Sequence, residues 1–458
     1  MTPMTQQPAP QVLELDDIQG AILRQFPMQG CTGGPMSYAG SNFVLRIDDP
    51  KDGREMLRRL IPYVASAVDT ALPVAGAEIN VALSYRGLAA LGVPQPSLDS
   101  FPQAFKEGMA ARAEIIGDVG ESAPANWEAP FGTADVHVAI TLVARDEATL
   151  ESAVAVAQMA QANLPGVTLN YRLDVARLPT GRTHFGYVDG IGQPWIEGSP
   201  TPGSPGETRP IKAGEFILGY PDATGQLPPL PQPDILGRNG TFVALRKLHE
   251  RVAAFRQFLR DNAPSPADEP LLAAKLLGRW PSGAPLAVAP DADDPALATD
   301  PRRNDDFGYG DDRLGLKCPI GAHIRRANPR DSLDDQAVDV GIHRIVRRGG
   351  SYGPVLPKGV LEDDGVDRGI IFFAIGTSLT RQFEFVLSQW LNDGNFVGLD
   401  AEKDAIAGAN DGTGTFTIPQ RPIRRRLDGV PRFVVTRGGE YCFVPSLKAL
   451  GWLANLDT

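Results

Sequence analysis

His323 stands in a segment whose residue types could hold a metal-containing group. The segment is CPIGAHIRRANPR, residues 318–330, in which two arginines directly follow the histidine. A neutral imidazole is a good axial ligand for iron. The guanidinium groups of Arg325, Arg326 and Arg330 could bind carboxylates of a ligand in a forked geometry. The alternative is a loop histidine beside a solvated basic run, and the segment taken alone favours that alternative.

Asp189 lies between glycines in a second segment, HFGYVDGIGQPW, residues 184–195. Because Gly186 and Gly190 have no side chains, the Asp189 carboxylate could closely approach a flat ligand. The alternative is a buried tight turn with a capping aspartate. The Gly-x-x-Asp-Gly pattern is weak, since a second copy occurs at 408–412 among turn-forming residues, where we expect a plain loop.

Arg347 belongs to a third segment, HRIVRRGGSYGP, residues 343–354. Paired arginines such as Arg347 and Arg348 are more often surface charges than catalytic groups. Held in a pocket, however, an arginine could stabilise the negative charge that develops when a peroxide O–O bond breaks.

The other histidines carry weaker signals. His137 alternates with apolar residues and is expected to be structural, whereas His249 is expected on the solvated face of a charged helix. His184 and His343 are the first residues of the second and third segments.

The elements that must position these residues follow a recurring pattern of a strand and then a helix. Strands are predicted from the β-rich runs at 42–47, 137–143, 241–245 and 369–375. Helices are predicted from about residue 51, from the Asp146 N-cap, at 248–259 and at 378–391. Four such units in two separated pairs predict an α+β fold: two ferredoxin-like domains with antiparallel sheets and helices.

The domain boundary is predicted near the Pro/Gly/Ser-rich stretch at 197–208, which divides the chain into residues 1–205 and 206–458. The second domain also contains an irregular region at about 283–312. Loops of that length in compact domains are often functional.

Composition narrows the functional class. The chain has 458 residues, 42% of them hydrophobic and 22% charged, and a net charge of −11. An acidic average argues against nucleic acid or an anionic membrane as the main partner.

The three cysteines, Cys31, Cys318 and Cys442, are far apart in the sequence. They form no Cys-x-x-Cys pair, and their odd number makes a disulfide framework unfavourable. No apolar run is long enough to span a membrane and no secretory signal is visible, so the cytoplasm is the default location, with a secreted mature form as the alternative.

Taken in order, the three segments resemble the dye-decolorizing peroxidase family, in particular its longer-loop members. The resemblance begins at LELDDIQGAILRQF and includes GYVDGIGQP, NGTFVALRKL, AKLLGRWPSGAPL, CPIGAHIRRANPRD, RRGGSYGP and QFEFVLSQW. Each match is weak alone, but together they cover most of the chain.

The resemblance implies non-covalent haem b, held mainly by the C-terminal domain, with His323 as the iron ligand. Asp189 and Arg347 correspond to the family's distal catalytic pair, and Asp404 is the candidate for a hydrogen bond to His323. The implied cofactor contacts are His323, Arg330, Arg325, Ile370, Phe372, Gly190, Ile191 and Asp404.

The implied reaction reduces hydrogen peroxide and oxidises dyes, phenols or other bulky aromatic reductants through an oxo-iron intermediate. Bulky reductants would react at a surface aromatic residue, for which Trp390, Tyr352 and Trp280 are candidates, although core packing is favoured for Trp390. Two other readings remain: a haem-binding protein for storage or iron release, and a cofactor-free interaction module. A homo-oligomer is compatible with the sequence.

Overall fold

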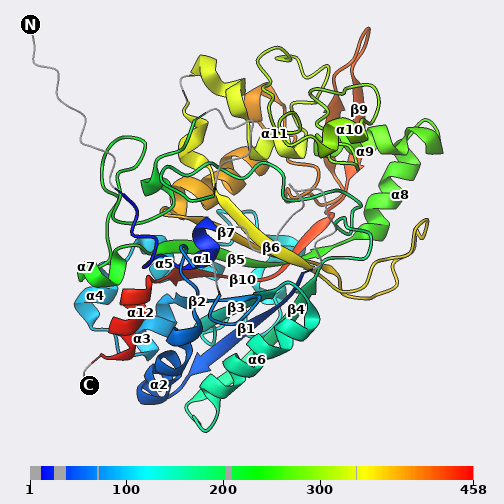
Figure 1. Ribbon diagram of the computed structural model, residues 1–458. Helices are drawn as coiled ribbons and strands as arrows, with labels where there is room; N and C mark the ends of the chain where they lie inside the picture. The colour runs from blue at the N-terminus through cyan, green and yellow to red at the C-terminus, as the bar shows by residue number, and fades with distance from the viewer. Residues whose placement is uncertain (1–11, 25–37, 70–71, 202–208, 337, 457–458) are drawn as a thin grey trace, which may run out of the picture.

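The computed structural model describes residues 12–24, 38–69, 72–201, 209–336 and 338–456. An eight-stranded closed barrel lies at its centre, with helices on its outside (Figure 1). Helices α2 and α6 lie on one side of the barrel, and α8 to α11 lie on the other side. Among the described helices, none is both long and apolar enough to cross a membrane.

Four strands of the barrel come from the first half of the chain. They are antiparallel and comprise β1 (Ala39–Ile47), β2 (Ala77–Ser84), β3 (Val138–Ala144) and β4 (Val167–Ala176). Their order is β4-β1-β3-β2, and α2 (Pro50–Leu60) and α6 (Glu147–Gln161) follow the first and third strands. This is the ferredoxin-like arrangement.

The second half repeats this order. Its strands are β5 (Thr241–Glu250), β6 (Val346–Tyr352), β7 (Gly369–Gly376) and β10 (Val434–Val444), in the order β10-β5-β7-β6. In both halves, therefore, the first strand pairs with the fourth and the third, and the third pairs with the second. The predicted duplicated ferredoxin-like fold is confirmed.

The two sheets close into a barrel through short junctions. Cys442 and Phe443 of β10 pair with Ser84 and Leu83 of β2, and Ala176 of β4 pairs with Ser351 of β6. The C-terminal helix α12 (Leu447–Ala454) packs against α2. The C-terminal helix thus contributes to holding the halves together.

Helices α2 and α6 begin where the sequence predicts, because a capping aspartate fixes the first turn of each helix. The Asp49 carboxylate accepts hydrogen bonds from the amides of Lys51 and Asp52 at the start of α2. Asp146 accepts from the amide of Thr149 at the start of α6, as predicted. The predicted helix at 248–259 starts later, because β5 continues to Glu250 and α8 spans Val252–Asn262.

The helix predicted at 378–391 is present but consists of two π-helical stretches, Thr380–Glu384 and Val386–Leu391. The Glu384 amide donates to the Leu379 carbonyl and the Asn392 amide to the Leu387 carbonyl, both five residues back. Such π turns are often found at functional sites.

The remaining elements are short. They are α1 (Gly20–Leu23), α3 (Tyr85–Ala90), α4 (Gln95–Asp99), α5 (Gln103–Glu107), α7 (Asp234–Gly237), α9 (Glu269–Leu277), α10 (Pro295–Thr299), α11 (His323–Ala327), and the hairpin of β8 (Gly414–Ile418) and β9 (Arg425–Val430), together with several 3₁₀ turns.

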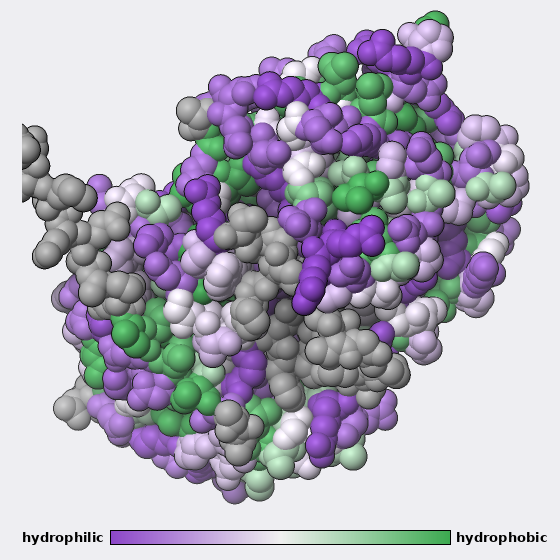
Figure 2. Space-filling view, turned by 45° about the horizontal axis from the view of Figure 1, so that its top comes forward, coloured by the Kyte–Doolittle hydropathy of each residue, from purple (hydrophilic) through white to green (hydrophobic). Residues whose placement is uncertain are grey.

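The main hydrophobic core fills the barrel and the space beneath α2 and α6. A smaller core lies between α8, α9 and the β8–β9 hairpin. Cys318 and Cys442 are buried and unpaired, whereas Cys31 lies outside the described residues. Polar and apolar side chains are interspersed over the face in Figure 2.

The predicted boundary at residues 205/206 lies between β4 and β5, which agrees with one ferredoxin-like unit on each side. Residues 202–208 are not described, and the boundary stays a prediction.

A buried cavity as the candidate active site

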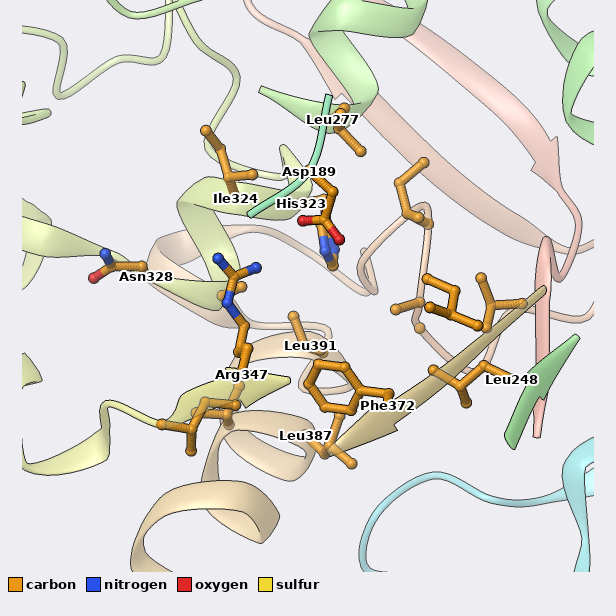
Figure 3. A pocket seen from close by; sticks show the side chains of 18 of the residues that line it. Asp189, Leu248, Leu277, His323, Ile324, Asn328, Arg347, Phe372, Leu387 and Leu391 are labelled. Atoms are coloured by element: carbon orange, nitrogen blue, oxygen red, sulfur yellow. The ribbon is translucent and has the colours of Figure 1, made fainter. Parts of the chain in front are cut away.

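A cavity of about 340 Å³ lies against the outer face of the second sheet. Its wall is formed by β5, β6, β7 and β10, by α11, by the π-helical stretches and by the loop that contains Asp189. Figure 3 shows the side chains of Asp189, His323, Arg347 and Phe372 gathered around it. Three segments that are far apart in the sequence therefore meet in one pocket.

Strand alternation decides which side chains face this cavity. Arg246 and Leu248 of β5 pair with Phe372 and Ile370 of β7, and all four line the cavity. Arg347 of β6 pairs with Ala374 and so lies on the same face of the sheet.

Arg348 points the other way, into the barrel. Its guanidinium donates to the carbonyls of Ala21 (2.9 Å) and Ile22 (3.3 Å), and burial lowers its pKa to about 10. The two neighbouring arginines, which the sequence left interchangeable, thus have different surroundings.

His323 begins α11 and is fixed by Asp404. The His323 Nδ1 lies 3.0 Å from Asp404 Oδ2, and the Asp404 carboxylate is fully buried. Asp404 also accepts from the amides of Ile406 (2.9 Å) and Ala407 (2.6 Å). The expected hydrogen bond is therefore present, and it leaves the other ring nitrogen of His323 on the cavity side.

The electrostatics of this pair favour a charged carboxylate beside a basic imidazole. Burial alone would raise the pKa of Asp404, but His323 and the amides hold it below its ordinary value. Burial would lower the pKa of His323, but the Asp404 carboxylate outweighs it and raises that pKa.

Arg347 is anchored to the loop of Asp189. Its Nη2 donates to the Ile191 carbonyl at 2.8 Å. The Gln193 side chain accepts from the Arg347 amide and donates to the Arg347 carbonyl, each at 3.1 Å. Arg347 and Asp189 are therefore held as one unit on the wall that faces His323.

Asp189 is exposed to the cavity, and its Oδ1 accepts from the Gly190 amide at 2.6 Å. The turn requires glycines, since Gly186 and Gly190 have φ values of 93° and 83°. The Asp189 charge raises the pKa of His323, and the Arg347 charge lowers it, so both groups act on the imidazole across the cavity. This arrangement can take up a proton and stabilise an anion at the same place.

Arg330 lines another part of the cavity. It donates to the carbonyls of Asp305 (2.9 Å) and Phe307 (3.1 Å), and its guanidinium stacks over the Phe307 ring. The Asp305 carboxylate forms ion pairs with both Arg330 and Arg279, the latter at 3.0 Å. These arginines could bind the carboxylates of a ligand at this edge.

Of the ten predicted site residues, seven line the cavity: Asp189, Ile191, His323, Arg330, Arg347, Ile370 and Phe372. Asp404 lies behind His323, and Gly190 shapes the turn. The structure does not bring Arg325 to the cavity. It follows His323 by two residues, roughly 200° around the helix, and it is buried against Asp312 and the Cys318 carbonyl.

Arg326, which the sequence also offered for ligand carboxylates, is buried as well. It donates to the carbonyls of Trp390, Glu402 and Asp393.

The other four histidines have structural surroundings. His137 Nδ1 accepts from the Ile47 amide, as expected for a structural residue. His249 lies on β5, and not on a helix, beside Asp367. His184 contacts the Tyr352 carbonyl, and His343 stacks on Phe385 at the cavity wall.

Several residues that line the cavity or hold its wall in place were not identified from the sequence. Gln193 lay within the quoted GYVDGIGQP segment, but nothing marked it as a partner of Arg347. Leu248 and Glu250 were assigned to a helix, which concealed their common strand face. Asp305 lies in the irregular region at 283–312, for which the sequence predicted a loop but marked no single residue.

The three aromatic candidates for surface oxidation are all buried. Tyr352 differs from Trp280 and Trp390 in its hydroxyl, which donates to the half-exposed Asp367 carboxylate at 3.2 Å. Lys247 lies over the Tyr352 ring and pairs with the same carboxylate.

Comparison with known proteins gives one family. Residues 17–171 match the model of the DyP dimeric alpha+beta barrel domain. A dye-decolorizing peroxidase from Exidia glandulosa is 32% identical over 98% of this chain and 88% of its own length.

Solved structures are similar over nearly the whole chain. A dye-decolorizing peroxidase in complex with 2,6-dimethoxyphenol is 28% identical, with a TM-score of 0.82, over 97% of this chain and all of the other. A structure described as the engineering of the heme pocket of a dye-decolorizing peroxidase is 29% identical, with a TM-score of 0.82, over 96% of this chain and all of the other.

Proposed function

Because the chain belongs to the dye-decolorizing peroxidase family, we propose that its cavity binds non-covalent haem b, with His323 as the iron ligand and Asp189 and Arg347 as the catalytic pair. The chain is a haem peroxidase, which reduces hydrogen peroxide and oxidises dyes, phenols and other organic reductants.

The observation that carries the residue assignment is the placement of His323. Asp404 fixes one ring nitrogen at 3.0 Å, and Asp189 and Arg347 act on the same imidazole across the cavity. An oriented imidazole on one side and a proton acceptor with a cation on the other are the groups that peroxide cleavage requires.

The residues present fit haem. The wall contains a flat run of apolar side chains from β5 and β7, including Leu248, Ile370 and Phe372. Arg330 lines the cavity where a propionate could be bound. When bound, haem supplies the iron at which peroxide is reduced.

The catalytic roles follow from the chemistry of each side chain. Asp189 would accept a proton from peroxide and return one to the departing oxygen, so that water leaves. Arg347 would stabilise the negative charge that develops on that oxygen. Asp404 keeps His323 oriented and basic. The apolar side chains of the sheet exclude bulk water from these groups.

Reductants too bulky for the cavity would react at the surface. Tyr352 is itself buried, so we assign it the role of an electron relay behind the surface, because its hydroxyl can pass a proton to Asp367 when the ring is oxidised. Trp280 and Trp390 are instead packed in buried apolar clusters, where the Trp280 indole donates to the Ala289 carbonyl.

Absorption spectra of wild type and His323→Ala, both supplemented with haem, test the cofactor and its ligand. We expect a Soret band in wild type that is lost or shifted in the variant, and a spectral change when one equivalent of peroxide is added to wild type. A haem spectrum that peroxide leaves unchanged would favour haem storage, and a wild type without haem would refute the assignment.

The catalytic pair is tested with Asp189→Asn and Arg347→Leu in peroxide-driven dye oxidation. We expect each to lower kcat/KM for peroxide by about 100-fold or more. Asp411→Asn is the matched control, since Asp411 occupies the second Gly-x-x-Asp-Gly copy in an exposed loop. Full activity in both cavity variants would overturn the assignment.

A further inference from the structure

Arg279 is a buried arginine in the cavity wall to which the reaction described above gives no role. It lies in the AKLLGRWPSGAPL segment, two residues after the end of α9, and is 7% exposed. Its guanidinium donates to the carbonyls of Gly283 (3.0 Å) and Asn304, and it forms an ion pair with Asp305 at 3.0 Å. Burying a charge is costly unless it is paired and hydrogen-bonded, and these contacts hold Arg279 in one position.

The Asp305 carboxylate is shared between two arginines. Its Oδ1 accepts from the Nη2 of Arg279 and from the Nη2 of Arg330, and Asp305 is only 1% exposed. Both guanidinium groups also lie over the Phe307 ring, with the Cζ of Arg279 at 5.4 Å and that of Arg330 at 4.0 Å from the ring centre. Because one negative charge meets two positive charges, these three charged side chains together are positive.

Arg330 is the most exposed member of the set. Its side chain is 16% exposed, whereas that of Arg279 is 8% and that of Asp305 is 1% exposed. All three line the cavity, so Arg330 is placed to touch a ligand and the other two lie behind it. The pKa of Arg279 falls to about 10, mainly because of burial, and Arg279 therefore stays charged at neutral pH.

Sharing the carboxylate has an electrostatic consequence. If Asp305 served Arg330 alone, its negative charge would largely cancel the attraction of that guanidinium for an anionic ligand group. Because Arg279 engages the same oxygen, the set keeps a positive charge behind the ligand-facing side chain. Charges only a few ångströms apart act strongly on one another in a partly buried site.

We propose that Arg279 is a specificity-determining residue: by sharing Asp305, it preserves the positive charge at Arg330 and makes this edge of the cavity select a porphyrin that bears carboxylates. The proposal rests on the proposed function, in which haem occupies the cavity, and it assigns the residue that sets the charge at one edge. Arg279 does not touch the ligand and acts through Asp305 and Arg330.

Two ligands that differ only in their carboxylates test this selection. The full-length apoprotein is titrated with haem and with haem dimethyl ester, which has the same iron and ring but no carboxylate charge, and the Soret band reports binding. Wild type should bind haem about tenfold or more tightly than the ester. In Arg279→Met this ratio of affinities should fall by about fivefold, because a positive charge is lost behind Arg330.

Asp305→Asn should change the same ratio in the opposite direction. The amide has the shape of the carboxylate and its oxygen can still accept from both arginines, but a negative charge is lost. The ratio should therefore rise by about fivefold. A set with only a structural role would alter the affinities for haem and ester alike and leave the ratio unchanged. If Asp305→Asn lowers the ratio as Arg279→Met does, Asp305 merely orients Arg330 and the proposal is wrong.

The ion pair of Asp312 with Arg325 provides the matched control. Its atoms are 3.2 Å apart, both side chains are 3% exposed, and the pair lies away from the cavity. Asp312→Asn should lower the unfolding free energy and leave the ratio as in wild type. A ratio that moves as far in Asp312→Asn as in Arg279→Met would overturn the assignment. Arg279→Lys keeps the charge and should retain most of the preference for haem.

The test does not depend on a single variant. Arg279→Gln also removes the charge and repeats the comparison if Arg279→Met does not fold. The titrations of wild type require no substitution, and equal affinities for haem and its ester would refute the selection by themselves. A wild type that binds neither compound would refute the proposed haem site, so that failure is distinguishable from failure of the role of Arg279.

Discussion

Gln193 and the main chain of Arg347 exchange two hydrogen bonds, each 3.1 Å long. The amide side chain accepts from the Arg347 N–H and donates to the Arg347 carbonyl, across 154 residues of sequence. This reciprocal pair binds the Asp189 loop to strand β6. Together with the hydrogen bond from Arg347 to the Ile191 carbonyl, it sets the relative position of Asp189 and Arg347.

Replacing Gln193 should therefore disturb catalysis without removing a catalytic group. We expect Gln193→Leu to lower kcat/KM for peroxide by about tenfold, since small displacements of catalytic groups can cost up to 100-fold. The Soret band should be unchanged, because His323 and Asp404 lie elsewhere. Steady-state kinetics and absorption spectra of the same preparation check both parts, and unchanged kinetics would contradict the positioning role.

Asp404 should determine how firmly haem is held. Loss of a partner that orients a metal-bound histidine typically costs 10–100-fold in affinity, and we expect about that loss for Asp404→Asn in a haem titration of the apoprotein. Asp411→Asn, in an exposed loop, should bind haem like wild type. Equal affinities in the two variants would contradict the orienting role of Asp404.

Substitutions at Arg330 and Arg325 should change different properties: haem affinity at Arg330 and folding stability at Arg325. Arg330 lines the cavity, so Arg330→Leu should weaken haem binding by about tenfold through loss of a charge-assisted contact. Arg325 is buried against Asp312 and away from the cavity. Arg325→Met should leave haem affinity intact but cost about 3 kcal/mol in unfolding free energy, because it leaves the buried Asp312 carboxylate with only the amides of Lys317 and Cys318. Haem titration and chemical denaturation of both variants distinguish the two effects.

Tyr352 should matter for bulky reductants only. We expect Tyr352→Phe to lower turnover of a large anthraquinone dye several-fold and to leave the reaction of the enzyme with peroxide unchanged. The phenylalanine keeps the packing but lacks the hydroxyl that donates to Asp367. Trp280→Phe is the control, since its indole nitrogen donates to the Ala289 carbonyl within a core. Equal dye turnover in wild type and Tyr352→Phe would reject this route.

Asp367 should make stability depend on pH in the acidic range. Burial would raise its pKa, but His249 and Lys247 hold the pKa well below its ordinary value of 3.8. The folded state therefore favours the carboxylate, and this contribution is present above about pH 4 and lost as the pH falls below it.

Because Asp367 is half-exposed, we expect its ion pairs to contribute about 1 kcal/mol after solvent screening. Asp367→Asn should lower the unfolding free energy by that amount at pH 7, and the difference from wild type should shrink below pH 4. Denaturation at several pH values checks this, and a difference that grows on acidification would contradict the sign.

Local signals in the sequence determined several elements correctly. β-rich runs identified parts of β1, β3, β5 and β7, and the Asp146 cap marked the start of α6, because these features depend on nearby residues. Ordered motifs identified His323, Asp189 and Arg347. Their glycines and prolines shape the backbone locally, so the motif remains recognisable before the fold is known.

Tertiary structure alone decided the rest. Leu248, His249 and Glu250 resemble the start of a helix, yet pairing with β7 and β10 keeps them in β5 and turns Leu248 and Glu250 toward the cavity. Strand alternation separates Arg347 from Arg348, and helix rotation separates His323 from Arg325. The partnership of His323 with Asp404, 81 residues away, depends on which distant segments pack together. The ordered motifs and their family resemblance thus indicated which chemistry to expect, whereas packing decided which side chains meet in the cavity, because contacts between distant segments form only when the sheets close.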